Sequence, residues 1–179
     1  MLAGLVLGAP GCLVVSVNPV YDDESIGFEP GLVGTWQDAD DNCSMQIDAG
    51  EWKSYRIHYV HPIENCNVTG DMTAVGDTKY LDVMPAAGVD RGSFLVPVHV
   101  VLRVGLEGDR LELTPLSYDW FAERVRRGSM GPAAPGLSVA FDQKKNALIV
   151  SPVAKLREWL RRRPQSGAMF GAPAVFRRK

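Results

Sequence analysis

Residues 94–114, FLVPVHVVLRVGLEGDRLELT, decide the fold class. The first part, Phe94–Leu106, is dense in valine and leucine, which is typical of a β-strand. Glu107-Gly108-Asp109 predicts a tight turn, and the alternation of apolar and polar residues in Arg110–Thr114 predicts a second strand. Two such strands joined by a tight turn indicate antiparallel β structure.

The rest of the chain repeats this arrangement of short strands and turns. Glycine and proline make up 30 of the 179 residues, which favours short strands over long helices. Short helices are predicted after Ser117 and Ser151, each of which stands where a helix N-cap is expected. The further predicted strands are Val33–Asp38, Cys43–Ile47, Ser54–Val60, Asn67–Val75, Lys79–Val83, Leu137–Phe141, Ala147–Val150 and Ala174–Phe176. We therefore expect a mainly β protein, an antiparallel meander or up-and-down barrel of about 8–10 strands with two short α-helices.

The beginning of the chain carries a pattern of secretion. Ala9-Pro10-Gly11-Cys12 resembles the lipobox of bacterial lipoproteins, in which small residues precede the cysteine that receives the lipid. The resemblance implies that residues 1–11 are a signal peptide, that Cys12 is lipidated, and that Leu13 directs the protein to the outer membrane. The alternative is a buried apolar N-terminal strand that contains a reduced cysteine.

The leader is incomplete at its start. It lacks basic residues and is 11 residues long, whereas a complete leader has roughly 15–30 residues. We therefore expect the true start codon upstream and residues 1–11 to be a truncated signal peptide. Residues 12–32 would then be a lipid-anchored tether, a coil that reaches ~25 Å, and residues 33–179 the folded domain.

Export would give the other two cysteines a role. With Cys12 acylated, Cys43 and Cys66 remain as an even pair, which predicts one disulfide in an oxidising compartment. Their spacing does not fit a redox motif or a zinc site. The alternative is two reduced thiols in a cytosolic protein. Because the lipid and the disulfide both require export, each prediction supports the other.

Gly34-Thr35-Trp36, at the first strand of the expected barrel, resembles the Gly-x-Trp motif that opens lipocalin-like, calycin-type barrels. The resemblance implies that Gly34 and Trp36 form a motif that closes one end of the barrel. It also implies a basic residue packed on the tryptophan, for which Arg177 and Arg178 are the candidates. Ser16–Tyr21 and Val96–His99 resemble a group of bacterial lipoproteins to which no activity is assigned.

The candidates for a ligand pocket are Tyr55, Tyr59 and His99. The two tyrosines share one face of an alternating strand, and His99 interrupts the strongest strand. The alternative for His99 is a hydrogen-bonded residue of the core. The sequence contains no nucleophile elbow, His-Glu-x-x-His pair or phosphate loop. We therefore assign no catalytic residue, metal ligand or cofactor and do not expect an enzyme; a hydrolase is the weakest of the hypotheses.

Charge is unevenly distributed along the chain. The net charge is −2, but residues 151–179 hold eight basic residues and one acid. Nucleic-acid binders usually have a basic domain, not one basic end, so no nucleic-acid partner is expected. Arg161, Arg162 and Arg163 end the second predicted helix, either as a solvated face or in contact with anionic lipid headgroups.

Together these patterns predict a lipid-anchored protein of the bacterial cell envelope, on the periplasmic face of the outer membrane. Its barrel would bind a small apolar ligand, as eight-stranded barrels can. The alternative is a structural or interaction lipoprotein with a filled barrel.

Overall fold

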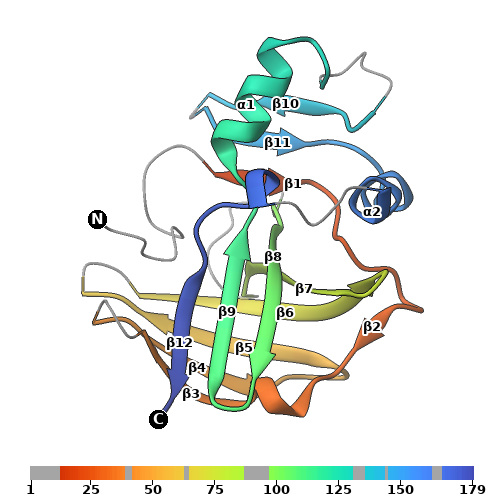
Figure 1. Ribbon diagram of the computed structural model, residues 1–179. Coiled ribbons are helices and arrows are strands. Elements are labelled where there is room, and N and C mark those ends of the chain that lie inside the picture. Colours follow the sequence, from red (N-terminus) through yellow and green to blue (C-terminus); the bar gives the residue numbers. More distant parts are fainter. Residues whose placement is uncertain are drawn as a thin grey trace.

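The structure is a computed structural model that describes residues 13–38, 42–62, 65–86, 97–130, 136–143, 145–162 and 167–179. Its main feature is a closed barrel of eight antiparallel strands (Figure 1). The strands follow one another around the barrel in chain order, and the last pairs with the first. They are β3 (Gly34–Asp38), β4 (Ser44–Ala49), β5 (Ser54–Val60), β6 (Asn65–Val75), β7 (Thr78–Pro85), β8 (Val100–Glu107), β9 (Arg110–Pro115) and β12 (Ala174–Arg178). The predicted fold class is confirmed.

The last strand, β12, completes the barrel by lying between β9 and β3. Phe176 is opposite Leu111 of β9 on one side and opposite Asp38 of β3 on the other. A closed barrel has no unpaired strand edge, because every strand has a neighbour on both sides.

A second, smaller sheet covers part of the outside of the barrel. It contains β1 (Val14–Ser16), β10 (Val139–Phe141) and β11 (Ala147–Ile149), with β11 in the middle and parallel to β1. Two helices, α1 (Tyr118–Arg126) and α2 (Val153–Arg162), accompany this sheet in the upper part of Figure 1. Two of the predicted strands therefore lie outside the barrel.

The barrel and the small sheet have separate cores, because alternate residues of the strands point to opposite faces. On β7, Leu81 belongs to the core inside the barrel, whereas Tyr80 belongs to the core under the small sheet. Val101 of β8 likewise contacts the second core. That core continues through Phe121 of α1 and Leu156 of α2.

The described part of the segment before the barrel, residues 13–33, contains regular structure. We predicted a coiled tether over residues 12–32, but the described part carries β1, β2 (Ile26–Gly27), which pairs with β6, and the short helix η1 (Pro30–Leu32). Val14 and Val15 are buried because β1 joins the small sheet. These two apolar residues explain the difference, since an exposed coil would leave them in water.

The two predicted helices are present, but the two serines predicted to cap them have different roles. The hydroxyl of Ser117 accepts a hydrogen bond from the Trp120 amide and caps α1. The hydroxyl of Ser151 instead accepts from the Ser138 amide at 2.7 Å, joining α2 to the approach to β10. A one-turn helix, η2 (Gly167–Met169), precedes β12. Across the described ranges, none of the helices has the length and apolar character to span a bilayer.

Candidate functional site

The inside of the barrel is the first place to look for a ligand site. Tyr55 and Tyr59 share one face of β5, as their alternation predicts, and both belong to the core inside the barrel. Trp36, Tyr55 and Phe176 are 0% exposed, and Ile57 and Tyr59 are 4% exposed. An empty ligand cavity would leave its lining side chains accessible to water. These side chains are enclosed by protein instead.

The spacing at the middle of β6 supports the same conclusion. Gly70 lies opposite Tyr55 of β5 and Val83 of β7. A methyl group added at Gly70 would meet Cδ1 of Ile57 and Cδ1 of Leu81 at 3.0 Å each. The barrel is therefore tightly packed at this level.

Trp36 and Arg178 join β12 to the start of β3 and to the residues that precede it. Arg178 lies opposite Trp36 in the β12–β3 pair, and its guanidinium carbon is 4.3 Å from the centre of the indole ring. The same guanidinium donates to the carbonyl oxygens of Val33 (2.9 Å) and Gly31 (2.6 Å). The indole Nε1 donates to the carbonyl oxygen of Leu32 at 2.8 Å. Of the two candidates for this basic residue, the structure selects Arg178.

Gly34 makes this arrangement possible. Its φ is +144°, a value that favours glycine. A Cβ atom at this position would lie 2.5 Å from a terminal nitrogen of Arg178. In the Gly-x-Trp motif, glycine therefore allows the positive φ and leaves room for the guanidinium of Arg178, and tryptophan supplies the aromatic ring that this guanidinium covers.

His99 lies outside the barrel, away from Tyr55 and Tyr59. Its Nδ1 is 2.6 Å from Oδ1 of Asp82 on β7, and both side chains are buried. The other oxygen of Asp82 accepts from the Val20 amide at 2.7 Å. The three residues predicted to line a pocket are thus not brought together. The structure fits the alternative for His99, a hydrogen-bonded residue of the core.

Asp82 is the partner that sequence reasoning missed. It interrupts the apolar run Tyr80-Leu81-Asp82-Val83, and a carboxylate in a buried strand needs a partner. That interruption is the one signal that the sequence offers for the pair.

A second carboxylate lies directly across from the first. Asp71 of β6 is opposite Asp82 in the β6–β7 pair. Desolvation, followed by the charge of Asp82, raises the pKa of Asp71 above its usual value. The pKa of Tyr21, which hydrogen-bonds to Asp71, rises to about 12, first because of burial and then because of the Asp71 charge.

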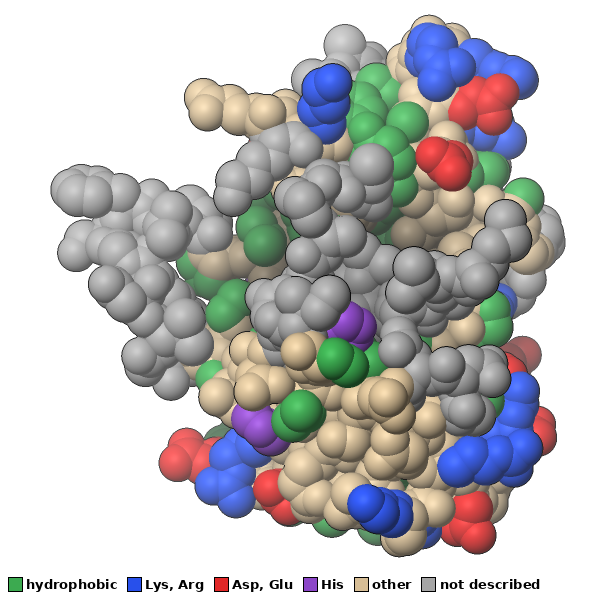
Figure 2. Space-filling view, turned by 90° about the vertical axis from the view of Figure 1, so that its left-hand side faces the viewer, with side chains coloured by type: hydrophobic (Ala, Val, Ile, Leu, Met, Phe, Trp, Pro, Cys, Tyr) green, Lys and Arg blue, Asp and Glu red, His purple; other side chains and the backbone are tan. Residues whose placement is uncertain are grey.

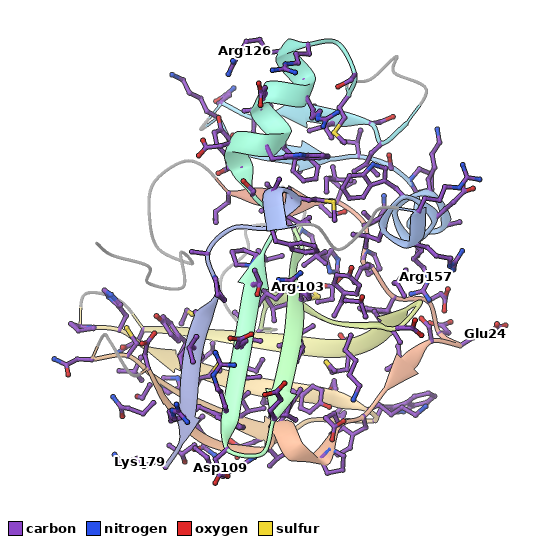
Figure 3. All side chains as sticks on the ribbon, in the orientation of Figure 1. Glu24, Arg103, Asp109, Arg126, Arg157 and Lys179 are labelled. Atoms are coloured by element: carbon purple, nitrogen blue, oxygen red, sulfur yellow. The ribbon has the colours of Figure 1, made fainter. Side chains whose placement is uncertain are left out.

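Arg157 extends this polar cluster to α2. Figure 3 shows Arg157 below α2, on the side of β2. Its guanidinium donates to the carbonyl oxygen of Val20 (2.8 Å) and to the hydroxyl of Thr73 (3.0 Å) and lies 3.3 Å from Oδ2 of Asp22. The cluster therefore ties the segment before the barrel to both β6 and α2.

The cluster does not form a serine triad. Ser16 is opposite His99 in an isolated antiparallel bridge. Its hydroxyl, however, donates to the carbonyl oxygen of Asn18 at 2.6 Å and is buried. A hydroxyl that donates to a carbonyl is not activated by a base. Within the described ranges, histidine, cysteine, aspartate and glutamate form no group of three that could hold a metal ion.

The predicted disulfide between Cys43 and Cys66 is not formed in the structure. Both cysteines belong to the barrel core. Ser44, next to Cys43, is opposite Val60 of β5, and Cys66 is opposite Tyr59 on the other side of the same strand. The cysteines are thus two strand spacings apart, about 10 Å, whereas a disulfide needs Cα atoms within roughly 7 Å. This prediction is wrong.

Four other predicted positions lie at or beyond the margins of the described residues. Cys12 and Arg163 lie outside them. Arg161 and Arg162 are exposed at the end of α2, and Arg162 forms an ion pair with Glu158 one turn earlier. This pairing fits a solvated helix face.

The surface presents a few exposed aromatic side chains. Trp52, in the turn between β4 and β5, is 99% exposed and has a φ of 58°. Phe28 is 40% exposed and stacks on Tyr55, and Phe141 is 41% exposed at the end of β10. Among the described residues, Val150 is the other large apolar side chain that is exposed, at 39%.

No family model, curated protein or solved structure matches this chain. The fold is compatible with a lipocalin-like barrel because of its eight-stranded closure.

Proposed function

We propose that this protein is a lipid-anchored protein of the bacterial cell envelope, on the periplasmic face of the outer membrane. Side chains would fill its barrel, and its surface would contact another envelope component. It would then not carry a small apolar ligand. The enclosure of the inward side chains, Trp36, Tyr55 and Phe176 among them, carries this proposal.

The turn that bears Trp52 supports an interaction role. A fully exposed indole gains no burial energy from folding, and a bulky residue with positive φ is unfavourable. The turn is nevertheless well defined, because the Gly50 amide donates to the Ser54 carbonyl oxygen at 2.8 Å and the Lys53 ammonium donates to the Ile26 carbonyl oxygen at 3.0 Å. Tryptophan is among the residues enriched at the centres of protein interfaces.

The anchor itself is supported by the lipobox that ends in Cys12. Because the disulfide is not formed, the pair of cysteines adds no support for export. The anchor is therefore proposed from the lipobox alone.

Native mass spectrometry of the protein purified from its own membranes tests the filled barrel. We expect the mass of the polypeptide with its acyl chains and nothing further. A small apolar molecule that co-purifies and leaves on gentle activation would refute the filled barrel and restore the ligand carrier.

Substitution of Cys12 tests the anchor. In a Gram-negative host, the chain behind a complete lipoprotein leader should fractionate with membranes, and Cys12→Ser should move it to the soluble periplasm. Cys66→Ser, the same change at another cysteine, should leave it in the membrane fraction. Membrane retention of Cys12→Ser would disprove the anchor.

A further inference from the structure

On the basis of the proposed anchor at Cys12, we propose that one end of the small sheet contacts the bilayer. This is the end at which β1 begins and at which β10 turns into β11. Phe141 would enter the interfacial region and Lys145 would face anionic headgroups. The lipid would then fix the orientation of the whole domain, whereas a flexible tether would leave it free to turn.

Leu13, the residue that follows Cys12 in the chain, is bound to β11 and to the residue before it. The carbonyl oxygen of Leu13 accepts from the Ala147 amide at 2.8 Å, and the Leu13 amide donates to the side-chain oxygen of Asn146 at 3.3 Å. Val14 is buried. Since each residue spans at most ~3.6 Å, the lipidated residue lies within about 7 Å of Val14. No slack remains between the lipid and the sheet.

Phe141 lies at the same end of the small sheet as the start of β1. Val14 is opposite Ala147 of β11, and Ala147 is opposite Phe141 of β10. The three residues therefore form a row across the sheet. Phe141, at the end of that row, is about 10 Å from β1 by strand spacing. Thus the start of β1 and the exposed ring of Phe141 reach the same side of the molecule.

This end of the small sheet carries aromatic and basic side chains, the two kinds that suit the surface of an anionic bilayer. Phe141 contacts Tyr118 of α1 edge-on, with ring centres 6.1 Å apart. A phenylalanine beside a half-buried tyrosine is an arrangement suited to the headgroup level of a bilayer, where aromatic rings are enriched. Lys145 is exposed in the turn that follows Phe141, and Asp142 accepts hydrogen bonds from the backbone of this turn. Figure 2, which views this side, shows hydrophobic side chains at the surface of the upper part with a basic side chain beside them.

The geometry also disfavours the basic end of α2 as the membrane contact. In Figure 1, β1 begins on the left of the small sheet, next to the β10–β11 turn, whereas α2 lies on the right. An anchor that leaves from β1 would bring Phe141 to the membrane before Arg161 or Arg162.

Photocrosslinking from two matched positions tests the inference. Phe141 and Phe28 are the same residue type, with exposures of 41% and 40%. Each is replaced in turn by benzoylphenylalanine, which keeps an aromatic side chain. The acylated full chain is reconstituted on vesicles of phosphatidylethanolamine and phosphatidylglycerol, illuminated, and analysed for covalent lipid.

We expect lipid adducts from position 141 and none from position 28. Adducts from both positions, or from neither, on protein that is acylated and vesicle-bound would overturn the orientation while leaving the anchor intact. A mass without acyl chains, with protein in the soluble fraction, would instead refute the proposed anchor and the orientation with it. Lys145→Glu should lower the adduct yield at position 141 on these vesicles, and an unchanged yield would exclude a headgroup contact by Lys145.

Discussion

Arg178 concentrates several interactions in one side chain, so its replacement is informative. Arg178→Gln removes the cation–π contact with Trp36 and the hydrogen bonds to two carbonyl oxygens. We expect a loss of about 2–3 kcal/mol in the free energy of unfolding, measured by urea denaturation. The neighbouring Arg177 is exposed, so Arg177→Gln should change stability by less than ~0.5 kcal/mol. Equal effects of the two changes would show that the contacts of Arg178 with Trp36 and with the carbonyl oxygens do not stabilise the fold.

Asp71 gives the stability a defined dependence on pH. Desolvation and Asp82 raise its pKa above 3.8 in the folded state. The folded state therefore binds the proton more tightly. The resulting stability is complete below pH 3.8 and is lost as the pH rises through the folded pKa. Asp71→Asn cannot ionise and should gain stability relative to the wild type between about pH 3 and about pH 7.

Urea denaturation at both pH values checks this prediction. Asp77→Asn, in the exposed β6–β7 turn, serves as the control and should show no comparable gain. A difference between Asp71→Asn and the wild type that does not change with pH would contradict the raised pKa.

Among the strands, β6 offers a direct test of how full the barrel is. Gly70→Ala places a methyl group 3.0 Å from two side chains of neighbouring strands, so we expect it to cost about 1–3 kcal/mol of stability. Gly27 of β2 has no atom within 4 Å of the equivalent methyl position, and Gly27→Ala should be tolerated. Thermal unfolding of both variants measures the difference. If both were neutral, the interior would have room beside Gly70.

At the level of elements, the sequence predicts those strands and turns that are set by residues close together in the chain. The alternation of β5 and the turn between β8 and β9 are local patterns. The predicted strands Ser54–Val60 and Arg110–Thr114 match β5 and β9. The predicted strand Phe94–Leu106 is shorter in the structure, where β8 begins at Val100, and residues 94–96 lie outside the described residues. The partner of Trp36 could be narrowed to two residues because β12 carries adjacent arginines. The strand β1 could not be placed, because its parallel pairing joins Val14 to Ala147, far away in the sequence.

The same reasoning explains the errors in the candidate site. His99 was considered with Tyr55 because it is a polar residue in the strongest predicted strand, but a residue's place in a strand does not say which face is inside the barrel. The pair of Asp82 and His99 could not be predicted, because a long connection separates β7 from β8 and the sequence does not show that these two strands are neighbours. The cysteine pair was counted without knowing that β5 lies between its members.

For the whole molecule, the proposed orientation assigns a position to Trp52. The Lys53 contact with Ile26 places its turn near β2, which lies at the lower right of Figure 1, opposite the start of β1. We therefore expect Trp52 to stay in water when the acylated protein is bound to vesicles. Acrylamide quenching of the wild type and of Trp52→Phe isolates its fluorescence, and shielding of Trp52 on vesicles would contradict this orientation.

The position of β12 between β3 and β9 also sets an order of events during biogenesis. The barrel cannot close until residues 174–178 have emerged, and β1 must wait for β11, which is synthesised late. Contacts between such distant parts of a chain form slowly, because a long loop must be closed first. Until β12 arrives, the edges of β3 and β9 that it covers stay open, so an exported chain would need protection against pairing with other strands during transit.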